Sequence, residues 1–335
     1  MSECKKKVYI GGQAVMEGVM MKAPDRLGIA VRRASDGGIE TFTKPVEAAA
    51  SKHKILGWPF VRGVVNFIES LTEGMKTITR SAEMIGDESL QEEPTKFEKW
   101  LSKVTGKDVM DIVMFVAVLL AILLAVGLFF VLPSLAGSLL NKLLPESTVL
   151  VNLLEGIVRL LIFLGYILAI SRMKEIKRVF MYHGAEHKTV YCNEAGEDLT
   201  VENCKKYSRL HPRCGTAFLL IVMFMSIVIT SVASVFGLDG NALTRILVRL
   251  ALLPVIASVS YEFLRWTGTH DNWFTRVLRW PGLQMQRLTT IEPTDDMLEV
   301  AIVAMQLAKG EYQPPVVEAE ESETPSDDDT EGAMG

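Results

Sequence analysis

Two histidines four positions apart, His183 and His187, are the residues of this chain best suited to chemistry. Side chains at i and i+4 lie on one face of a helix, so both imidazoles can bind one metal ion. Glu186 directly precedes the second histidine, and the spelling HxxEH matches the inverted zinc-protease signature, in which this glutamate activates the attacking water. The motif therefore predicts a divalent metal, zinc in the first place, with His183 and His187 as ligands and Glu186 as a catalytic residue.

Further nitrogen and sulfur donors follow close behind this motif. Of the five histidines in the chain, His211 lies in the same segment, and Cys214 follows it at a turn. If both join the first two histidines, the site is closed and structural. If three groups bind and Glu186 stays free, water occupies the fourth place and catalysis becomes possible. The remaining interpretation is that the histidines are ordinary polar residues of a helix near lipid headgroups.

Several charged residues fall within or beside apolar stretches, where a charge is costly and often functional. Glu262 is a candidate metal ligand on depth alone, because inverted zinc proteases take their third ligand from a distant glutamate on another helix. The alternative for Glu262 is an ion pair with Arg265. Glu155 and Arg159 share one helix face, and Arg249 lies at a similar depth. These three predict an ion pair between helices or, alternatively, a polar cavity for a charged lipid or peptide group.

Four apolar stretches predict helices that cross a membrane. The chain of 335 residues is 49 % apolar, too much for a disordered chain, and the apolar residues are concentrated rather than evenly spread. Each stretch has about the 20 residues that a helix needs to cross a bilayer core. The predicted spans are residues 112–132, 149–170, 216–236 and 242–264. The lipid bilayer is therefore the first expected partner.

The distribution of basic residues predicts the orientation of the chain in the membrane. Lys and Arg are retained on the cytoplasmic side, and the segment between the second and third spans is the most basic connection. Its basic residues are Arg172, Lys174, Lys177, Arg178, Lys188, Lys205, Lys206, Arg209 and Arg213. The N-terminus carries no apolar core of a secretory signal. A bacterial plasma-membrane protein with both termini in the cytoplasm is expected, and its four cysteines should then be free thiols.

The chain divides into seven predicted regions. A β-rich cytoplasmic unit comes first, because two apolar runs (29–32 and 39–43) flank a turn-prone cluster, with partner strands at 8–15 and 18–21. Thr294 begins a short docking helix that ends at Gly310. Residues 318–331 hold eight acidic groups and no basic one, so the tail is predicted to be disordered. The regions are the β-rich unit (1–50), an amphipathic helix with a charged linker (51–107), two spans (108–171), the His/Cys loop (172–214), two further spans (215–265), an interfacial segment with the docking helix (266–311) and the tail (312–335).

A glycine-rich segment near the N-terminus, GGQAVMEGVMM at residues 11–21, is the other candidate for function. Glycines let a ligand or a loop approach the backbone closely, and Gln13 and Glu17 could supply polar contacts to it. The alternative is a glycine-rich strand that packs tightly beneath the membrane helices.

Several motifs in the same order resemble the YqhQ-like family of bacterial multipass membrane proteins. They cover nearly the whole chain except the acidic tail: GGQAVMEGVMM (11–21), RG (62–63), ES (69–70), HGAEHK (183–188), RCGTAF (213–218), and PGLQMQRLTTIEP with EVA (281–301). The resemblance implies a metal-dependent enzyme. It also implies that the glycine-rich segment and the histidine loop belong to one functional unit, so Glu17 is added to the candidate catalytic residues.

Two functions compete at this point. The first is a membrane-embedded metal-dependent hydrolase that acts on a membrane peptide or a lipid. The second is a non-enzymatic assembly or scaffold factor that holds a structural metal or none. Transport is poorly supported, because the ionisable residues within the spans form no clear relay. Nucleic acid is not an expected partner, and a homo-oligomer is left open.

Overall fold

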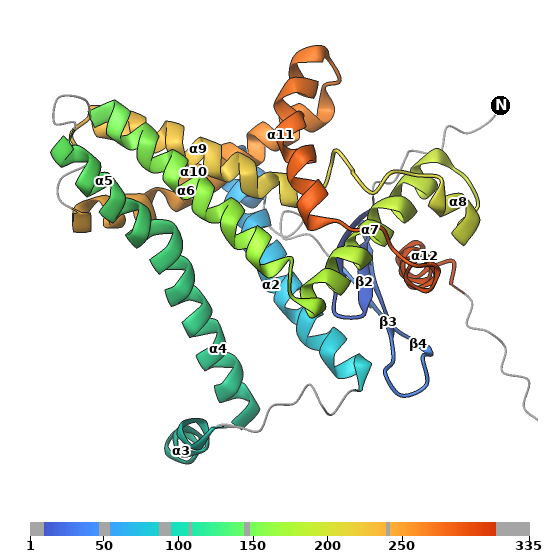
Figure 1. Ribbon diagram of the computed structural model, residues 1–335. Coiled ribbons are helices and arrows are strands. Elements are labelled where there is room, and N and C mark those ends of the chain that lie inside the picture. The colour runs from blue at the N-terminus through green and yellow to red at the C-terminus, as the bar shows by residue number, and fades with distance from the viewer. Residues whose placement is uncertain are drawn as a thin grey trace, which may run out of the picture.

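A computed structural model describes the chain over six ranges of residues. These are residues 10–46, 54–86, 95–106, 109–143, 148–238 and 242–312. The predicted disorder of the acidic tail concerns residues that lie almost entirely outside these ranges, as does the start of the chain before Ile10. The described part is mainly helical, with one small sheet near the N-terminus (Figure 1).

A four-stranded antiparallel sheet contains the glycine-rich segment. Its strands pair in sequence order, so β1 and β4 are the two edges. The strands are β1 (Gly11–Val15), β2 (Gly18–Lys22), β3 (Arg26–Arg32) and β4 (Ile39–Pro45). The pairing of β3 with β4 confirms the predicted hairpin, and β1 and β2 are its predicted partners.

Helices cover both faces of this sheet, which is therefore the middle of three layers. One face, which includes Val19 and Met21, packs against α7 (Lys174–Ala195) and α12 (Asp295–Lys309). The opposite face, which includes Ile29, packs against the C-terminal end of α2 (Val61–Ile85). Side chains alternate between the faces of a strand, so the nearly continuous apolar runs of β2 and β3 supply both cores.

Helix α12 is the predicted docking helix, and it packs very closely on the sheet. It begins after Thr294 and ends at Gly310, whose positive φ of 72° is typical of a helix C-terminus. A Cβ atom at Gly28 of β3 would lie 2.5 Å from Cβ of Leu307. The glycine therefore permits the close approach of the helix to the strand.

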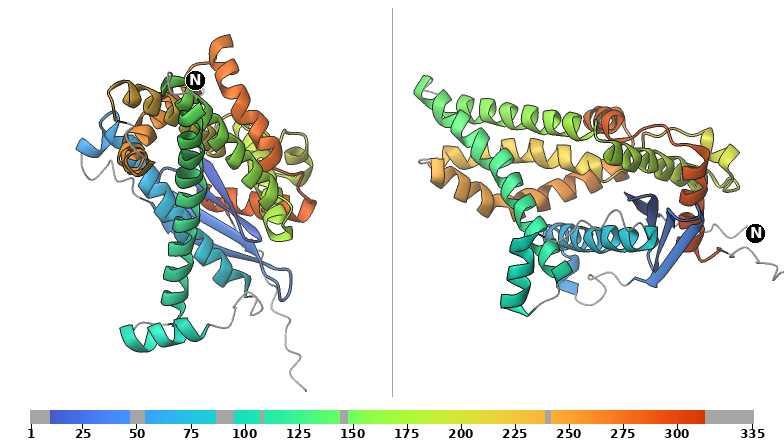
Figure 2. Two further views of the ribbon diagram at one scale, coloured as in Figure 1. Left: turned by 60° about the vertical axis from the view of Figure 1, so that its left-hand side comes forward. Right: turned by 60° about the horizontal axis from the view of Figure 1, so that its bottom comes forward.

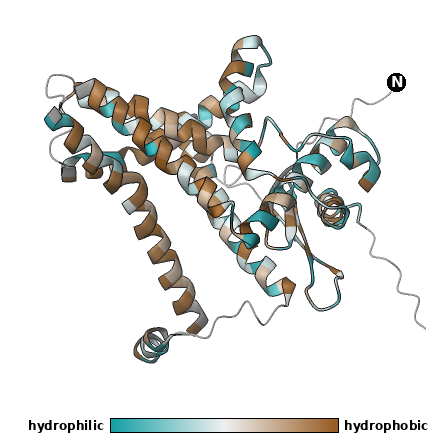
Figure 3. Ribbon diagram, in the orientation of Figure 1, coloured by the Kyte–Doolittle hydropathy of each residue, from teal (hydrophilic) through white to brown (hydrophobic). Residues whose placement is uncertain are grey.

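Within the described ranges, four helices are long and apolar enough to cross a membrane, in agreement with the four predicted spans; their apolar character is visible in Figure 3. The candidate spans are Ile112–Lys142, Leu150–Ile170, Thr216–Val235 and Leu243–Thr269. They are built from α4 (Val109–Val126), η3 (Gly127–Val131), α5 (Leu132–Leu143), α6 (Thr148–Ile170), α9 (Thr216–Val235) and α10 (Ala242–Thr269). The remaining helices are η1 (Lys54–Gly57), α3 (Lys96–Thr105), α8 (Val201–Lys205) and α11 (Trp273–Thr289).

The first span is longer than predicted because the helix continues past residue 132. A π-helical turn, η3, joins α4 to α5, and the Leu132 N–H donates to the Gly127 carbonyl five residues back. Pro133 follows directly and has no N–H to donate. The wider turn thus coincides with a residue that cannot continue the regular hydrogen-bond pattern.

Helix α2 connects the sheet to the membrane helices (Figure 2). Its N-terminal half packs on α10, where a Cβ at Gly63 would lie 2.8 Å from Cα of Ser258, and Asn66 donates to the Tyr261 hydroxyl at 2.8 Å. Its C-terminal end contributes Met84 to the core beneath the sheet. The amphipathic helix predicted in residues 51–107 therefore packs against a span.

Buried charges join three of the membrane helices. Glu155 of α6 is fully buried, and it accepts a hydrogen bond from Arg249 of α10. Arg159 lies 3.7 Å and Arg245 lies 3.9 Å from its carboxylate oxygens, and Ser134 of α5 donates to it at 3.3 Å. The predicted ion pair between helices is therefore present, and it includes one more arginine than expected.

Replacing Glu155 by Gln should destabilise the protein strongly. The arginines would lose the carboxylate that balances their charge in the membrane interior, and breaking a buried pair typically costs about 3–5 kcal/mol. A matched control is Glu83→Gln, because Glu83 pairs with Arg80 on an exposed surface, where a pair contributes only about 0.2–1 kcal/mol. Thermal unfolding in detergent should show a large drop in midpoint for Glu155→Gln alone. Equal midpoints for the two variants would contradict a structural role of the buried carboxylate.

Candidate metal centre

The HxxEH motif lies in the central, buried part of α7. The segment was predicted as a cytoplasmic loop in which His183 and His187 lie on a helix, and in the structure that helix has 22 residues. His183, Glu186 and His187 are all less than 9 % exposed. Gly184 between them lies against the chain after α11, because a Cβ there would be 2.2 Å from the carbonyl oxygen of Ile291. This close contact fixes the position of α7, and with it the two histidines, relative to the chain after α11.

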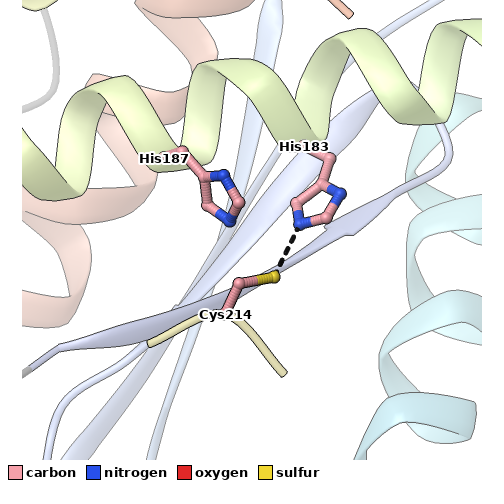
Figure 4. A group of neighbouring side chains, drawn as sticks. All are labelled: His183, His187 and Cys214. Carbon is pink, nitrogen blue, oxygen red and sulfur yellow. Dashed lines mark hydrogen bonds between the residues drawn. The ribbon is translucent and has the colours of Figure 1, made fainter. Parts of the chain in front are cut away.

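His183, His187 and Cys214 form a compact group of possible metal ligands (Figure 4). One donor atom from each lies within 4.8 Å of the other two, and Nε2 of His183 is 3.2 Å from Sγ of Cys214. Zinc bonds of about 2.0–2.1 Å to nitrogen and 2.3 Å to sulfur place tetrahedral ligand atoms roughly 3.5 Å apart. The group therefore fits zinc in donor type, and the His183–Cys214 separation is close to this spacing.

The hydrogen bonds behind the two imidazoles orient them toward this common point. Nδ1 of His183 lies 2.8 Å from the Thr289 carbonyl oxygen, and Nδ1 of His187 lies 2.5 Å from that of Arg209. A carbonyl oxygen only accepts, so each Nδ1 carries the proton and each Nε2 keeps its lone pair. Nε2 of His187 is buried without a hydrogen-bond partner. Such carbonyl partners are typical of the outer shell of a metal site.

A pocket of about 700 Å³ opens beside this group. Its walls come from β1, α2, α7 and the turn after His211, and they include His183, Glu186 and Cys214. A ligand set of three protein groups that faces a cavity leaves a position for water or substrate. This arrangement corresponds to the open alternative rather than the closed one.

Glu186 lies in the pocket wall next to the ligand group. Burial raises the pKa of its carboxyl, whereas His183, His211 and the backbone N–H of Ala14 act in the opposite direction. A raised pKa suits a general base, because such a group accepts a proton best when its pKa is close to the ambient pH. Gly12 makes room for this side chain, since a Cβ at that position would lie 2.8 Å from Glu186 Cδ.

His211 lies beside the group but outside it. Its ring is 5.7 Å from that of His187, centroid to centroid, and 4.4 Å from that of Tyr191. Its Nδ1 accepts the Arg213 N–H at 3.3 Å, so this nitrogen is turned to its own loop. Burial lowers the pKa of His211 to about 4. The ring therefore remains neutral at pH 7 and packs in the wall behind the ligands.

Gln286 holds the turn that presents Cys214, a role that the sequence did not suggest. Its side chain is fully buried, accepts the His211 N–H at 2.8 Å and donates to the His211 carbonyl at 2.8 Å. Thr289, on the same helix α11, supplies the carbonyl that orients His183. Both residues lie in the PGLQMQRLTT motif. The motif was noted in the sequence, but nothing in its residue types pointed to contacts with the histidine helix.

Glu17 lies in the turn between β1 and β2 and is not part of the pocket wall. It forms a two-pronged ion pair with Arg178 of α7, and the Tyr182 hydroxyl donates to it at 3.4 Å. Its positive φ of 49° is held by this turn. The contact joins the hairpin to α7, so the structure assigns Glu17 a positioning contact at a distance from the ligand group.

Glu262 is also absent from the ligand group. It pairs with Arg62 of α2 at 2.5 Å, and the Phe60 N–H lies 3.4 Å from the same carboxylate. The ion pair expected with Arg265 is thus formed with another helix instead. Periodicity along α10 could not reveal this, because the partner approaches from α2.

Metal content should distinguish these residues. His187→Ala and Cys214→Ala each remove one of three ligands and should weaken zinc binding by more than the 10–100-fold that loss of an outer-shell partner typically causes. His211→Ala should retain bound zinc, because its ring lies outside the group. Zinc stoichiometry of the detergent-purified protein measures this, with the exposed His270→Ala as control. Loss of zinc from His211→Ala with retention in Cys214→Ala would contradict the assigned ligand set.

Adding one methyl group at Gly184 should disturb the centre. Its Cβ would meet the Ile291 backbone, and overpacking of this kind costs about 1–3 kcal/mol. Gly215→Ala is a matched control, because no atom lies within 4 Å of a Cβ at that position. Thermal unfolding and zinc titration should show losses for Gly184→Ala only. Normal zinc affinity in a destabilised Gly184→Ala protein would show that the contact between Gly184 and Ile291 is not needed to position the metal ligands.

Comparisons with known proteins agree with the motif resemblance. The family model described as "Protein of unknown function (DUF1385)" matches residues 58–311. The "Uncharacterized protein YqhQ" of Bacillus subtilis (strain 168) is 34 % identical over 308 residues, which cover 90 % of this chain and 92 % of that protein. No solved structure matches. The chain therefore belongs to the YqhQ-like DUF1385 family.

Proposed function

We propose that this membrane protein is a metal-dependent hydrolase whose site lies where α7 meets the sheet. The observation that carries the proposal is the convergence of His183, His187 and Cys214 beside a pocket that also contains Glu186. Three ligands, an adjacent buried carboxylate and space for a substrate are the parts that hydrolysis of a carbonyl compound requires.

Each residue of the group has a distinct role in this proposal. A divalent metal, zinc by its fit to the donors, supplies Lewis acidity that polarises the substrate carbonyl. Glu186 accepts a proton from the attacking water, whose oxygen bonds to the carbonyl carbon. It then returns the proton to the departing nitrogen or oxygen as the scissile bond breaks. The Thr289 and Arg209 carbonyls keep the imidazoles in the tautomer that can bind the metal.

A purely structural metal is the second candidate, and it requires a fourth protein ligand. Among the described residues, the ligand group holds three. His211 lies nearby as a further donor, but its Nδ1 accepts the Arg213 N–H, so the neutral ring carries its proton on Nε2 and offers no lone pair there. The open side of the group therefore favours catalysis over a closed structural site.

The proposed location of the site is the cytoplasmic surface of the bacterial plasma membrane. The basic residues that cluster between the second and third spans support this orientation. Helix α2 packs on the span α10 near its N-terminal end and lines the pocket with its middle part, through Ser70 and Gly74. A substrate at the membrane surface would therefore reach the pocket over a short path.

Glu186→Gln tests the catalytic role directly. The amide keeps the size of the side chain but cannot accept the proton, so zinc should remain bound while hydrolysis falls by about 10²–10⁴-fold. Zinc-loaded protein in nanodiscs would be incubated separately with a tryptic digest of casein and with phospholipid vesicles, and products followed by mass spectrometry. Glu83→Gln serves as control on an exposed surface. Unchanged turnover in Glu186→Gln, or no turnover by zinc-loaded wild type in either assay, would reject the proposal.

A further inference from the structure

The edge of the sheet that faces the metal pocket is the strand β1. Among the described strands, β1 pairs with β2 on one side and with none on the other. Residues 11–14 of β1 line the pocket, together with Val179 and Phe180 of α7 and with Gly74 of α2. Since α7 and α2 cover opposite faces of the sheet, the groove between them lies in line with the sheet and beside its free edge.

The register of the hairpin determines which backbone groups point into this groove. A two-residue turn, Met16-Glu17, connects the paired residues Val15 and Gly18. In such a turn the closing pair is hydrogen-bonded, and bonding alternates from there along the strand. Gly12 and Ala14 therefore direct their N–H and C=O groups away from β2, toward the groove. The Ala14 N–H is engaged by the Glu186 carboxylate, which agrees with this assignment, so the groups offered to an incoming strand are those of Gly12 and the Ala14 C=O.

The side chains on this edge leave room for a second backbone. A Cβ at Gly11 would meet no atom within 4 Å, whereas a Cβ at Gly12 would collide with Glu186. Glycine at these positions thus opens the groove and brings the carboxylate to the strand edge. A free edge with unpaired backbone groups is a template for an added strand, and native proteins usually cover or disrupt such an edge.

We infer that β1 binds an extended peptide as an additional strand, which carries one of its peptide bonds past His183, Glu186 and Cys214. The inference rests on the proposed function and narrows its substrate class to extended polypeptide. Strand addition provides main-chain hydrogen bonds at every second residue, and the alternate side chains occupy the walls. A lipid has no such periodic donors and acceptors.

The length of β1 and the lining of the groove agree with this occupant. Five residues of β1 extend over about 17 Å at roughly 3.3 Å per residue, which matches a peptide of similar length. Met20, Ala23, Val179 and Phe180 supply apolar walls for its side chains. The bound segment of the substrate would have to be unfolded or locally extended, because the edge strand β1 cannot pair with a helix.

Selective methylation of backbone amides tests the inference without requiring turnover. The probe is a fluorescein-labelled, blocked octapeptide of alternating Leu and Ser, bound to zinc-loaded Glu186→Gln protein in nanodiscs. Two further peptides carry N-methyl groups on all Leu or on all Ser residues, so their numbers of methyl groups are equal. Strand addition predicts that one methylated peptide binds at least about 10-fold more weakly than the other, because only one set of amides faces β1. Equal affinities of the two peptides, or no binding of the parent octapeptide at 1 mM, would overturn the inference.

A variant of the groove provides the second measurement. Gly74→Leu places a side chain on the α2 wall, where a Cβ would lie 3.1 Å from the flexible amide of Gln13. It should retain zinc and lose octapeptide affinity by at least about 10-fold. Gly165→Leu is the matched control, because a Cβ there meets no atom within 4 Å. Undiminished binding to Gly74→Leu would place the peptide elsewhere and overturn the inference.

The outcomes also separate this inference from the proposed function. If the two methylated peptides differ in affinity but the wild-type protein cleaves neither casein peptides nor phospholipid, the edge of β1 binds peptide and the hydrolase proposal fails. If wild type hydrolyses phospholipid and the methylated peptides bind alike, the hydrolase proposal stands and the peptide inference fails.

Discussion

The buried polar face of α7 is the constraint on which the arrangement of the site depends. Two histidines, a glutamate and Lys188 are buried in one helical segment, and each polar atom there requires a partner. The partners come from distant parts of the chain: the Thr289 and Arg209 carbonyls for the imidazoles, and Glu292 for Lys188. The sheet, α11 and the turn before α9 must therefore assemble around α7 together. On α7, Nε2 of His187 is left without a hydrogen-bond partner, and it belongs to the group of possible metal ligands.

Buried polar groups also require partners in the membrane helices, but there they form ion pairs rather than a group of possible metal ligands. Glu155 forms ion pairs with its arginines, and Ser134 bonds to both sides, so these contacts between opposite charges hold α5, α6 and α10 together. At the metal group, by contrast, the donors converge without neutralising one another, and a pocket lies alongside. Pairing of opposite charges characterises a structural cluster, whereas convergent lone pairs beside a cavity characterise a ligand site.

Much of the fold could be predicted from local patterns. The spans, the four strands and the helix that ends at Gly310 each follow from hydrophobic periodicity or turn residues within a short window. The extension of the first span beyond residue 132 was missed, because a proline usually ends a helix and here a π-helical turn precedes it. The placement of α2 could not be predicted, since an amphipathic helix can lie on a membrane or on another helix equally well.

For the site, the sequence by itself determined which residues could bind a metal, because the i, i+4 spacing of His183 and His187 and the softness of a nearby thiol are local properties. Only the tertiary structure decided which of the candidates come together. Cys214 joins the histidines because Gln286 fixes its turn, while Glu17 and Glu262 are paired with arginines from other elements. The free edge of β1 beside the pocket was likewise invisible in the sequence. Such outcomes depend on long-range packing, which brings together residues whose separation along the chain carries no information about their distance.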